Sequence, residues 1–134
     1  MASWSSVLFL KYDRMTKKTL VMGASTKPQR YSNIATHRLL GKGHDVVLVG
    51  YREGQIGEYP ILTGTPPIED VDTITLYMNP KRQQPYYDYF LSLKPKRIIF
   101  NPGTENPELI QLAQENGIEP EVACTLVMLA SNQY

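Results

Sequence analysis

The sequence predicts an α/β domain in which two layers of helices cover a mostly parallel sheet. Short apolar segments alternate with helical patterns along the chain, as βαβ units require. The segments Thr19–Met22 and Val46–Val49 are apolar almost throughout, which is typical of parallel strands buried on both faces. Gly23 and Gly50 follow them directly, so we predict a turn at the end of each strand.

A helical pattern between these two strands completes one βαβ unit. We predict a helix from about Asn33 to Lys42, with Ser32 as its N-cap and Gly43 as its C-terminal stop. The segment after the second strand, Gly54–Pro67, is rich in glycine and proline and is predicted to be a loop.

The next strand is predicted at Thr73–Tyr77. It runs into Asn79-Pro80, an N-cap residue followed by a proline at the first helical position. The helix predicted after it carries an i, i+4, i+7 series of apolar residues on one face, which consists of Tyr86, Phe90 and Leu93.

Two further strand and helix pairs are predicted in the last part of the chain. Arg97–Phe100 reads as a strand, and Asn106-Pro107 begins a helix that Asn116-Gly117 ends. Glu119–Ala123 and Thr125–Ser131 are predicted as a last strand and a last short helix. Together these elements predict a Rossmann-like three-layer sandwich.

The chain length fits one domain. With 134 residues it can bury a core, but it has no room for a nucleotide domain and a separate catalytic domain. We assign residues 15–134 to the domain and treat residues 1–14 as an N-terminal extension without a function. We therefore expect one site, or a site completed by a homodimer or a partner enzyme.

Composition excludes several classes of partner. The formal net charge is +1, and no run of Lys or Arg is long enough for a nucleic-acid or membrane patch. No apolar run approaches the roughly 20 residues that span a bilayer. The single cysteine, Cys124, leaves no internal disulfide and no Cys/His zinc cluster. We expect a cytoplasmic protein that does not bind a metal, a nucleic acid or a membrane.

Candidate binding residues directly follow the predicted strands. In open α/β sheets the ligand lies beyond the carboxyl ends of the strands, where the strand order reverses. The residues found there are small, polar or basic, and they are Gly23, Ala24, Ser25, Thr26, Lys27, Pro28, Gly50, Tyr51, Arg52, Met78, Asn79, Pro80, Asn101, Pro102, Gly103, Thr104 and Cys124.

The segment after the first strand predicts a phosphate site. A glycine turn between a strand and a helix lets backbone N–H groups and a helix N-terminus meet a phosphate. Hydroxyl groups of Ser25, Thr26 and Ser32 can add donors, and Lys27 and Arg30 add positive charge. The alternative is a simple connecting turn, and the segment does not match the G-x-G-x-x-G pattern of dinucleotide sites.

Arg52 bears on the identity of the nucleotide. An NAD site favours an acidic residue at the end of the second strand, where this chain has Gly50-Tyr51-Arg52. An arginine there suits a phosphate on the adenosine ribose, at the 2′ position in NADP or the 3′ position in coenzyme A. Arg52 as a plain surface charge is the alternative interpretation.

The sequence from Leu20 to about Leu129 resembles the small stand-alone CoA-binding proteins, which are related to the N-terminal domain of the succinyl-CoA synthetase alpha subunit. The resemblance is carried by the following segments: Val21 to Pro28, Arg30-Tyr31-Ser32, Leu39 to Val46, Ile56 to Pro60, Val71-Asp72, Asn101-Pro102-Gly103 and Gly117 to Cys124. The family usually has a Val-Asn-Pro-like turn after its second strand, and this chain departs from it at Val49-Gly50-Tyr51-Arg52.

The resemblance implies coenzyme A as the cofactor and a role for each segment. Gly23 to Pro28 would hold phosphates together with Arg30, Tyr31, Ser32 and Asn33. Gly50 to Arg52 would approach the adenosine, Met78 to Pro80 the adenine or the pantetheine, and Asn101 to Thr104 would form the far wall.

We predict non-catalytic binding of coenzyme A or acyl-CoA. No residue is assigned a catalytic role, because His37, His44 and Cys124 lie in no recognisable catalytic motif. Two alternatives remain open, an NADP-dependent oxidoreductase and a protein-interaction module that has lost its nucleotide.

Overall fold

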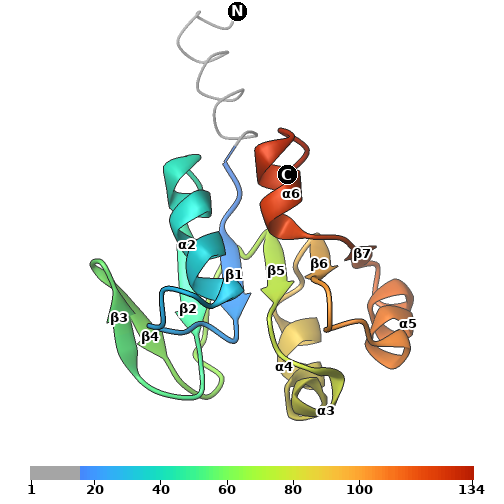
Figure 1. Cartoon of the computed structure of the whole chain (residues 1–134). Helices are drawn as coiled ribbons and strands as arrows, with labels where there is room; N and C mark the ends of the chain where they lie inside the picture. The colour runs from blue at the N-terminus through green and yellow to red at the C-terminus, as the bar shows by residue number, and fades with distance from the viewer. Residues whose placement is uncertain (1–15) are drawn as a thin grey trace, which may run out of the picture.

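The described part of the chain folds around one sheet of seven strands, shown in the computed structural model of Figure 1. The structure describes residues 16–134, so the predicted extension, residues 1–14, lies outside the described residues. The strands are β1 (Thr19–Met22), β2 (Val46–Val49), β3 (Gly54–Ile56), β4 (Tyr59–Leu62), β5 (Thr73–Leu76), β6 (Arg97–Phe100) and β7 (Glu119–Val122). Their order across the sheet is β3-β4-β2-β1-β5-β6-β7.

The sheet is parallel except at one edge, as the sequence predicts. β1 pairs in parallel with β2 on one side and with β5 on the other, in register Thr19 with Val46 and Thr19 with Thr73. β6, β7 and β4 continue the parallel pairing outward, and only β3 is antiparallel to its neighbour. The chain leaves β1 for one side of the sheet and later returns to the other side, so the strand order reverses between β1 and β5.

Helices cover both faces of this sheet. They are α2 (Tyr31–Gly41), α3 (Pro80–Gln83), the 3-10 helix Gln84–Tyr86, α4 (Tyr87–Ser92), α5 (Pro107–Glu115) and α6 (Thr125–Ala130). In Figure 1, α2 and α6 lie on one face, and α3, α4 and α5 lie toward the other.

Two apolar cores separate the three layers. Leu20 and Met22 of β1 pack with Phe90 of α4, whereas Val21 packs with Leu39 of α2 and Leu129 of α6. This is the alternation that a strand covered on both faces requires. The predicted three-layer sandwich is confirmed.

Helix α2 begins two residues earlier than we predicted, and Ser32 is not its N-cap. Arg30 holds the N-cap position with extended backbone, and no side chain caps the helix there. The chain turns into the helix through backbone bonds from Arg30 N–H to Lys27 O at 3.1 Å and from Asn33 N–H to Arg30 O at 3.0 Å. Ser32 therefore lies in the first turn and is buried.

The segment predicted as a Gly- and Pro-rich loop contains a hairpin. β3 and β4 pair antiparallel, with Gly54 opposite Ile61 and Ile56 opposite Tyr59. Gly57, with φ +59°, lies in the short turn between them, a position that suits a residue without a side chain. The strands are short and contain Gly54 and Pro60, residues that are uncommon within strands. Their composition therefore does not predict strands.

The helix predicted after β5 is broken into three pieces. Pro85 lies in the 3-10 helix that separates α3 from α4, and a proline supplies no N–H group for an α-helical hydrogen bond. Phe90 is fully buried, as predicted, and its ring stacks on Tyr86 at 5.8 Å between centroids. Asn79 is the N-cap of α3, as predicted, and accepts Arg82 N–H. Asn106, where a helix was predicted to begin, caps α5 and accepts Leu109 N–H.

The buried position of His44 makes the stability of the protein depend on pH. Its Nδ1 atom accepts the backbone N–H of Lys17 at 3.0 Å, and its ring packs 4.9 Å from the ring of Tyr134. Burial lowers the pKa of His44 below its ordinary value of 6.5, and the nearby charges of Lys17 and Arg97 lower it further. Protonation therefore favours the unfolded chain, in which the pKa is higher.

We expect this contribution to stability to be complete above pH 6.5 and to be lost progressively below it, as the pH falls to the folded pKa. Thermal unfolding between pH 7.5 and 5.5 measures it. The melting temperature should fall less over this interval in His44→Gln, whose amide oxygen can still accept the Lys17 N–H. His37→Gln, at an exposed position on α2, is the matched control. A fall in His44→Gln as large as in the unchanged protein would show that another group is responsible.

Candidate functional site

A cleft of about 680 Å³ lies at the carboxyl ends of the central strands. The segments that follow β1, β2, β5 and β6 line it, so it lies where the strand order reverses. Of the residues predicted from the sequence, the cleft brings together Gly23, Ala24, Ser25, Thr26, Lys27, Arg30, Tyr31, Ser32, Tyr51, Arg52, Met78, Asn79, Pro102, Gly103 and Thr104.

Six of the predicted residues do not line this cleft, namely Pro28, Asn33, Gly50, Pro80, Asn101 and Cys124. The two asparagines instead hold the backbone around it. The Asn33 amide donates to Ser25 O at 2.9 Å. The Asn101 amide donates to the Thr75 hydroxyl and to Leu76 O, and its oxygen accepts Thr125 N–H. Both side chains are therefore engaged in folding the turns rather than directed at a ligand.

The other four also have structural explanations. Gly50 is buried, and a Cβ atom there would lie 2.4 Å from Ala24 O, so this glycine allows two turns to approach each other. Pro80 begins α3, and Pro28 is exposed before α2. Cys124 is a half-buried free thiol at the N-cap of α6.

The sequence did not single out four residues that line the cleft, and they are Glu53, Ile61, Tyr77 and Arg82. Arg82 had a usable signal, because it lies in the first turn of the helix that follows Asn79-Pro80. Ile61 lies in β4, which was predicted as loop, so no strand end was expected near it.

The first two N–H groups of the glycine turn after β1 bond within the protein. Gly23 N–H and Ala24 N–H both donate to Val49 O, at 2.8 and 3.0 Å. A Cβ atom on Gly23 would lie 2.8 Å from Tyr77 O, and its φ of +98° also favours glycine. The turn therefore ties β1 to its neighbours and positions the segment that follows.

The N-terminus of α2 is the candidate anion site of the cleft. The N–H groups at the start of an α-helix have no carbonyl partner within the helix, and the helix dipole adds positive potential there. No side chain caps α2, and its first turn contains no acidic residue. Tyr31 and Ser32 of this first turn line the cleft, as do Lys27 and Arg30 just before it.

Positive charge dominates the cleft. Four cationic side chains, Lys27, Arg30, Arg52 and Arg82, and one carboxylate, Glu53, are among its described lining residues. Such an excess of positive charge in a concave site attracts a ligand with several negative charges. Phosphate groups are among the anions that bind both to arginines and to helix N-termini.

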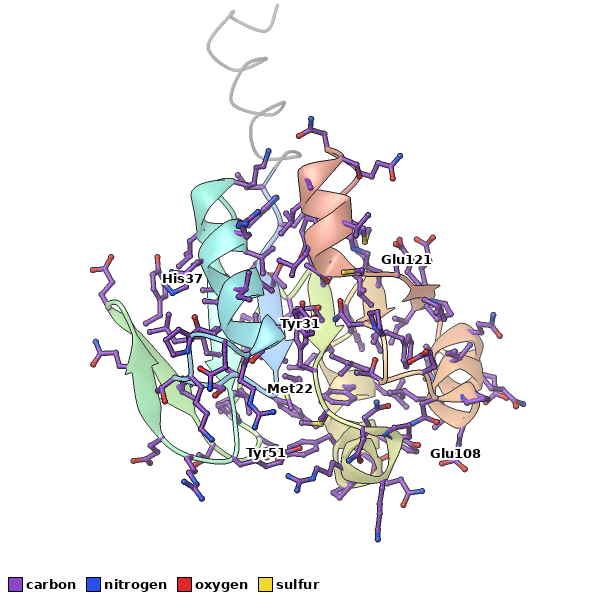
Figure 2. The ribbon with its side chains drawn as sticks, in the orientation of Figure 1. Met22, Tyr31, His37, Tyr51, Glu108 and Glu121 are labelled. Carbon is purple, nitrogen blue, oxygen red and sulfur yellow. The ribbon has the colours of Figure 1, made fainter. Side chains whose placement is uncertain are left out.

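Tyr51 and Arg82 contact each other across the cleft. The guanidinium carbon of Arg82 lies 4.4 Å from the centroid of the Tyr51 ring, a cation–π contact. Figure 2 labels Tyr31, the first residue of α2, and Tyr51, which follows β2. Both tyrosines are exposed, so their rings are accessible from the cleft.

The hydroxyl of Tyr77 is buried and has no hydrogen-bond partner among residues 16–134. Burial raises the pKa of Tyr77 to about 12. The hydroxyls of Thr75 and Thr125 bond each other at 2.8 Å. The Tyr77 phenol is therefore protonated at neutral pH and contributes no charge to the cleft.

Gln83 is a buried residue that connects the two cleft segments after β5 and β6 by hydrogen bonds. It is fully buried, and its amide donates to Met78 O and to Thr104 O, each at 2.8 Å. Its oxygen accepts the amide of Asn106 at 2.8 Å. Met78 and Thr104 line the cleft after β5 and β6, so Gln83 fixes the distance between these two segments.

A family model described as a CoA binding domain matches residues 17–130, which include the sheet and all the residues that line the cleft. The chain belongs to the CoA-binding domain family. Membership supports binding of coenzyme A in general. No protein of curated function matches this CoA-binding domain.

Solved structures agree with this assignment. The CoA-binding domain is 50% identical to an uncharacterized protein whose crystal structure superposes with a TM-score of 0.87, over 89% of this chain and 98% of that one. A protein from Thermus thermophilus, cell-free ID.343, is 19% identical with a TM-score of 0.80, over 96% and 98% of the two chains. A hypothetical protein from Pyrococcus horikoshii OT3 is 22% identical with a TM-score of 0.77, over 98% and 93%. The last two likenesses show the fold.

Two further findings concern the described part of this CoA-binding domain. Within residues 16–134, no helix combines the length and the apolar character needed to cross a membrane. In the same range, His, Cys, Asp and Glu side chains form no group of three that is able to hold a metal ion.

Proposed function

We propose that this chain binds coenzyme A or an acyl-CoA without transforming it, and that the N-terminus of α2 holds the phosphates. The observation that carries the proposal is the uncapped start of α2, which lines the cleft together with Lys27 and Arg30. A helix N-terminus with adjacent cationic side chains is a favourable site for a pyrophosphate.

The charge of the cleft suits coenzyme A in particular. Coenzyme A carries a pyrophosphate and a separate 3′-phosphate, so it needs cationic groups at two places. Lys27 and Arg30 are next to the α2 N-terminus, and Arg52 follows β2, toward which the adenosine of a nucleotide extends in this class of fold. We assign the pyrophosphate to the first pair and the 3′-phosphate to Arg52. The pantetheine arm would then extend toward Pro102 and Gly103.

NADP is the second candidate, because Arg52 suits its 2′-phosphate as well. The glycine turn disfavours it, since Gly23 and Ala24 use their N–H groups to bind Val49 O and the turn has no further glycine before Pro28. A titration that includes both nucleotides separates the two candidates. It also tests the interaction-module alternative, which predicts that neither binds.

Isothermal titration of the full chain with CoA, dephospho-CoA, NADP and NAD tests the proposal. We expect CoA to bind most tightly, and dephospho-CoA to bind about tenfold more weakly because a charge-assisted hydrogen bond is lost. Arg52→Ala should weaken CoA by a similar factor and leave dephospho-CoA unchanged.

Arg38→Ala is the matched control, because Arg38 is exposed in the last turn of α2, at the helix end opposite the candidate phosphate site. This variant should bind CoA like the unchanged protein. If none of the four nucleotides binds, the proposal is wrong and a protein-interaction function becomes the better explanation.

A further inference from the structure

Two exposed tyrosines line one cleft. Tyr31 is 71% exposed and Tyr51 is 52% exposed, whereas the other described tyrosines are at least partly buried. Both line the positively charged cleft. Exposed aromatic rings beside cationic groups form a surface that suits the flat ring of a nucleotide base.

Tyr51 differs from Tyr31 in having a planar partner. The guanidinium of Arg82 lies over its ring at 4.4 Å. Tyr51 comes from the segment after β2, and Arg82 comes from α3, which follows β5. These segments lie on opposite sides of β1 in the sheet, so the contact spans the cleft at the point where the strand order reverses.

The position of Arg82 is fixed by its own helix. The side chain of Asn79 accepts Arg82 N–H at 3.0 Å, which holds the first turn of α3. The side chain of Arg82 is exposed and forms no salt bridge with another described residue. Its contact with Tyr51 is therefore not required to neutralise a buried charge.

We propose that Tyr51 and Arg82 form the base subsite of the cleft, on which the adenine ring of the bound nucleotide stacks. This inference rests on the proposed function. Both aromatic rings and guanidinium planes are stacking partners for nucleic-acid bases. Arg82 is thus a recognition residue in addition to Arg52, and Tyr51 supplies the aromatic face.

Two ligand fragments test this subsite in the full chain. Adenosine 3′,5′-bisphosphate carries the base and the ribose phosphate, whereas 4′-phosphopantetheine carries neither. Tyr51→Leu should weaken the bisphosphate about tenfold, which lies within the range of about 5-fold to 150-fold that base stacking contributes, and should change phosphopantetheine affinity less than twofold. Tyr51→Phe keeps the aromatic face and should bind both fragments like the unchanged protein.

Arg82→Gln and Arg82→Lys test the second member of the pair. Both should weaken the bisphosphate, because neither side chain offers a guanidinium plane. Arg38→Gln is the control for loss of a cation, at an exposed position outside the cleft. Arg82→Lys with unchanged affinity would show that Arg82 acts through its charge alone and would overturn its place in the stack.

Ligand-observed NMR gives an independent readout. The adenine H2 and H8 resonances of the bisphosphate should shift upfield with the unchanged protein and with Tyr51→Phe, because the ring current of a stacked aromatic acts on them. They should not shift with Tyr51→Leu.

The outcomes separate this inference from the proposed function. If the unchanged protein binds CoA, and Tyr51→Leu binds each fragment with the same affinity as the unchanged protein does, only the base subsite is wrong. An equal loss of both fragments in Tyr51→Leu also contradicts the subsite, since phosphopantetheine has no base. If the unchanged protein binds neither fragment nor CoA, the proposed function fails and the subsite fails with it.

Discussion

Gly50→Ala is expected to abolish ligand binding and to destabilise the protein by about 3 kcal/mol, the upper end of the cost of overpacking a core. The added Cβ atom would lie 2.4 Å from Ala24 O and 3.0 Å from the Ile61 side chain. Neither neighbour can move freely, since Ala24 N–H bonds Val49 O at 3.0 Å and Ile61 is buried. The turn that precedes α2 must therefore shift, and the candidate phosphate site shifts with it.

Gly41→Ala is the matched control for this substitution. Gly41 is the last residue of α2, and no atom from beyond the adjacent residues and the local helix backbone lies within 4 Å of a Cβ atom placed there. Alanine should stabilise the helix by about 0.5–1 kcal/mol and leave binding unchanged. Urea unfolding and a CoA titration measure both variants. A Gly50→Ala protein with the unchanged urea midpoint and normal CoA affinity would show that the two turns are not held as closely as described.

Gln83→Leu is expected to destabilise the protein by about 3 kcal/mol. The substitution leaves the carbonyl oxygens of Met78 and Thr104 without the donor that each has from the Gln83 amide. Each buried group left without a partner costs about 1–3 kcal/mol. Gln83→Glu should be worse, since a carboxylate cannot donate to either carbonyl and brings a buried charge.

The neighbouring residue provides the control for Gln83. Gln84 is exposed, so Gln84→Leu should change the free energy of unfolding by less than about 0.5 kcal/mol. Urea unfolding of the three variants gives the comparison. Equal stability of Gln83→Leu and Gln84→Leu would mean that the buried amide does not hold the two segments together.

The elements that the sequence predicted correctly have local signals. β1, β2, β5 and β6 are short, mostly apolar segments. Asn79-Pro80 and Asn106-Pro107 begin helices because an asparagine cap and a proline in the first turn act within a few residues. The rule that ligands lie beyond parallel strands then places most of the cleft residues without knowledge of the structure.

The features that sequence analysis missed depend on distant partners. Gln83 reads as a surface residue, but its partner carbonyl on Thr104 lies 21 positions away in sequence. The contact between Tyr51 and Arg82 arises because α3 follows the strand on the far side of β1, which no local pattern records. The N–H groups of Gly23 and Ala24 are taken by Val49 O only once β1 and β2 have paired.

Backbone amide shifts on addition of CoA test the central claim most directly, which is that the N-terminus of α2 holds the phosphates. We expect the largest ¹⁵N–¹H shifts at Tyr31 and Ser32, which begin the uncapped helix, and smaller ones at Gly23 and Ala24, whose N–H groups bind Val49 O. Shifts confined to residues outside the cleft, or the absence of any shift at saturating CoA, would contradict the claim.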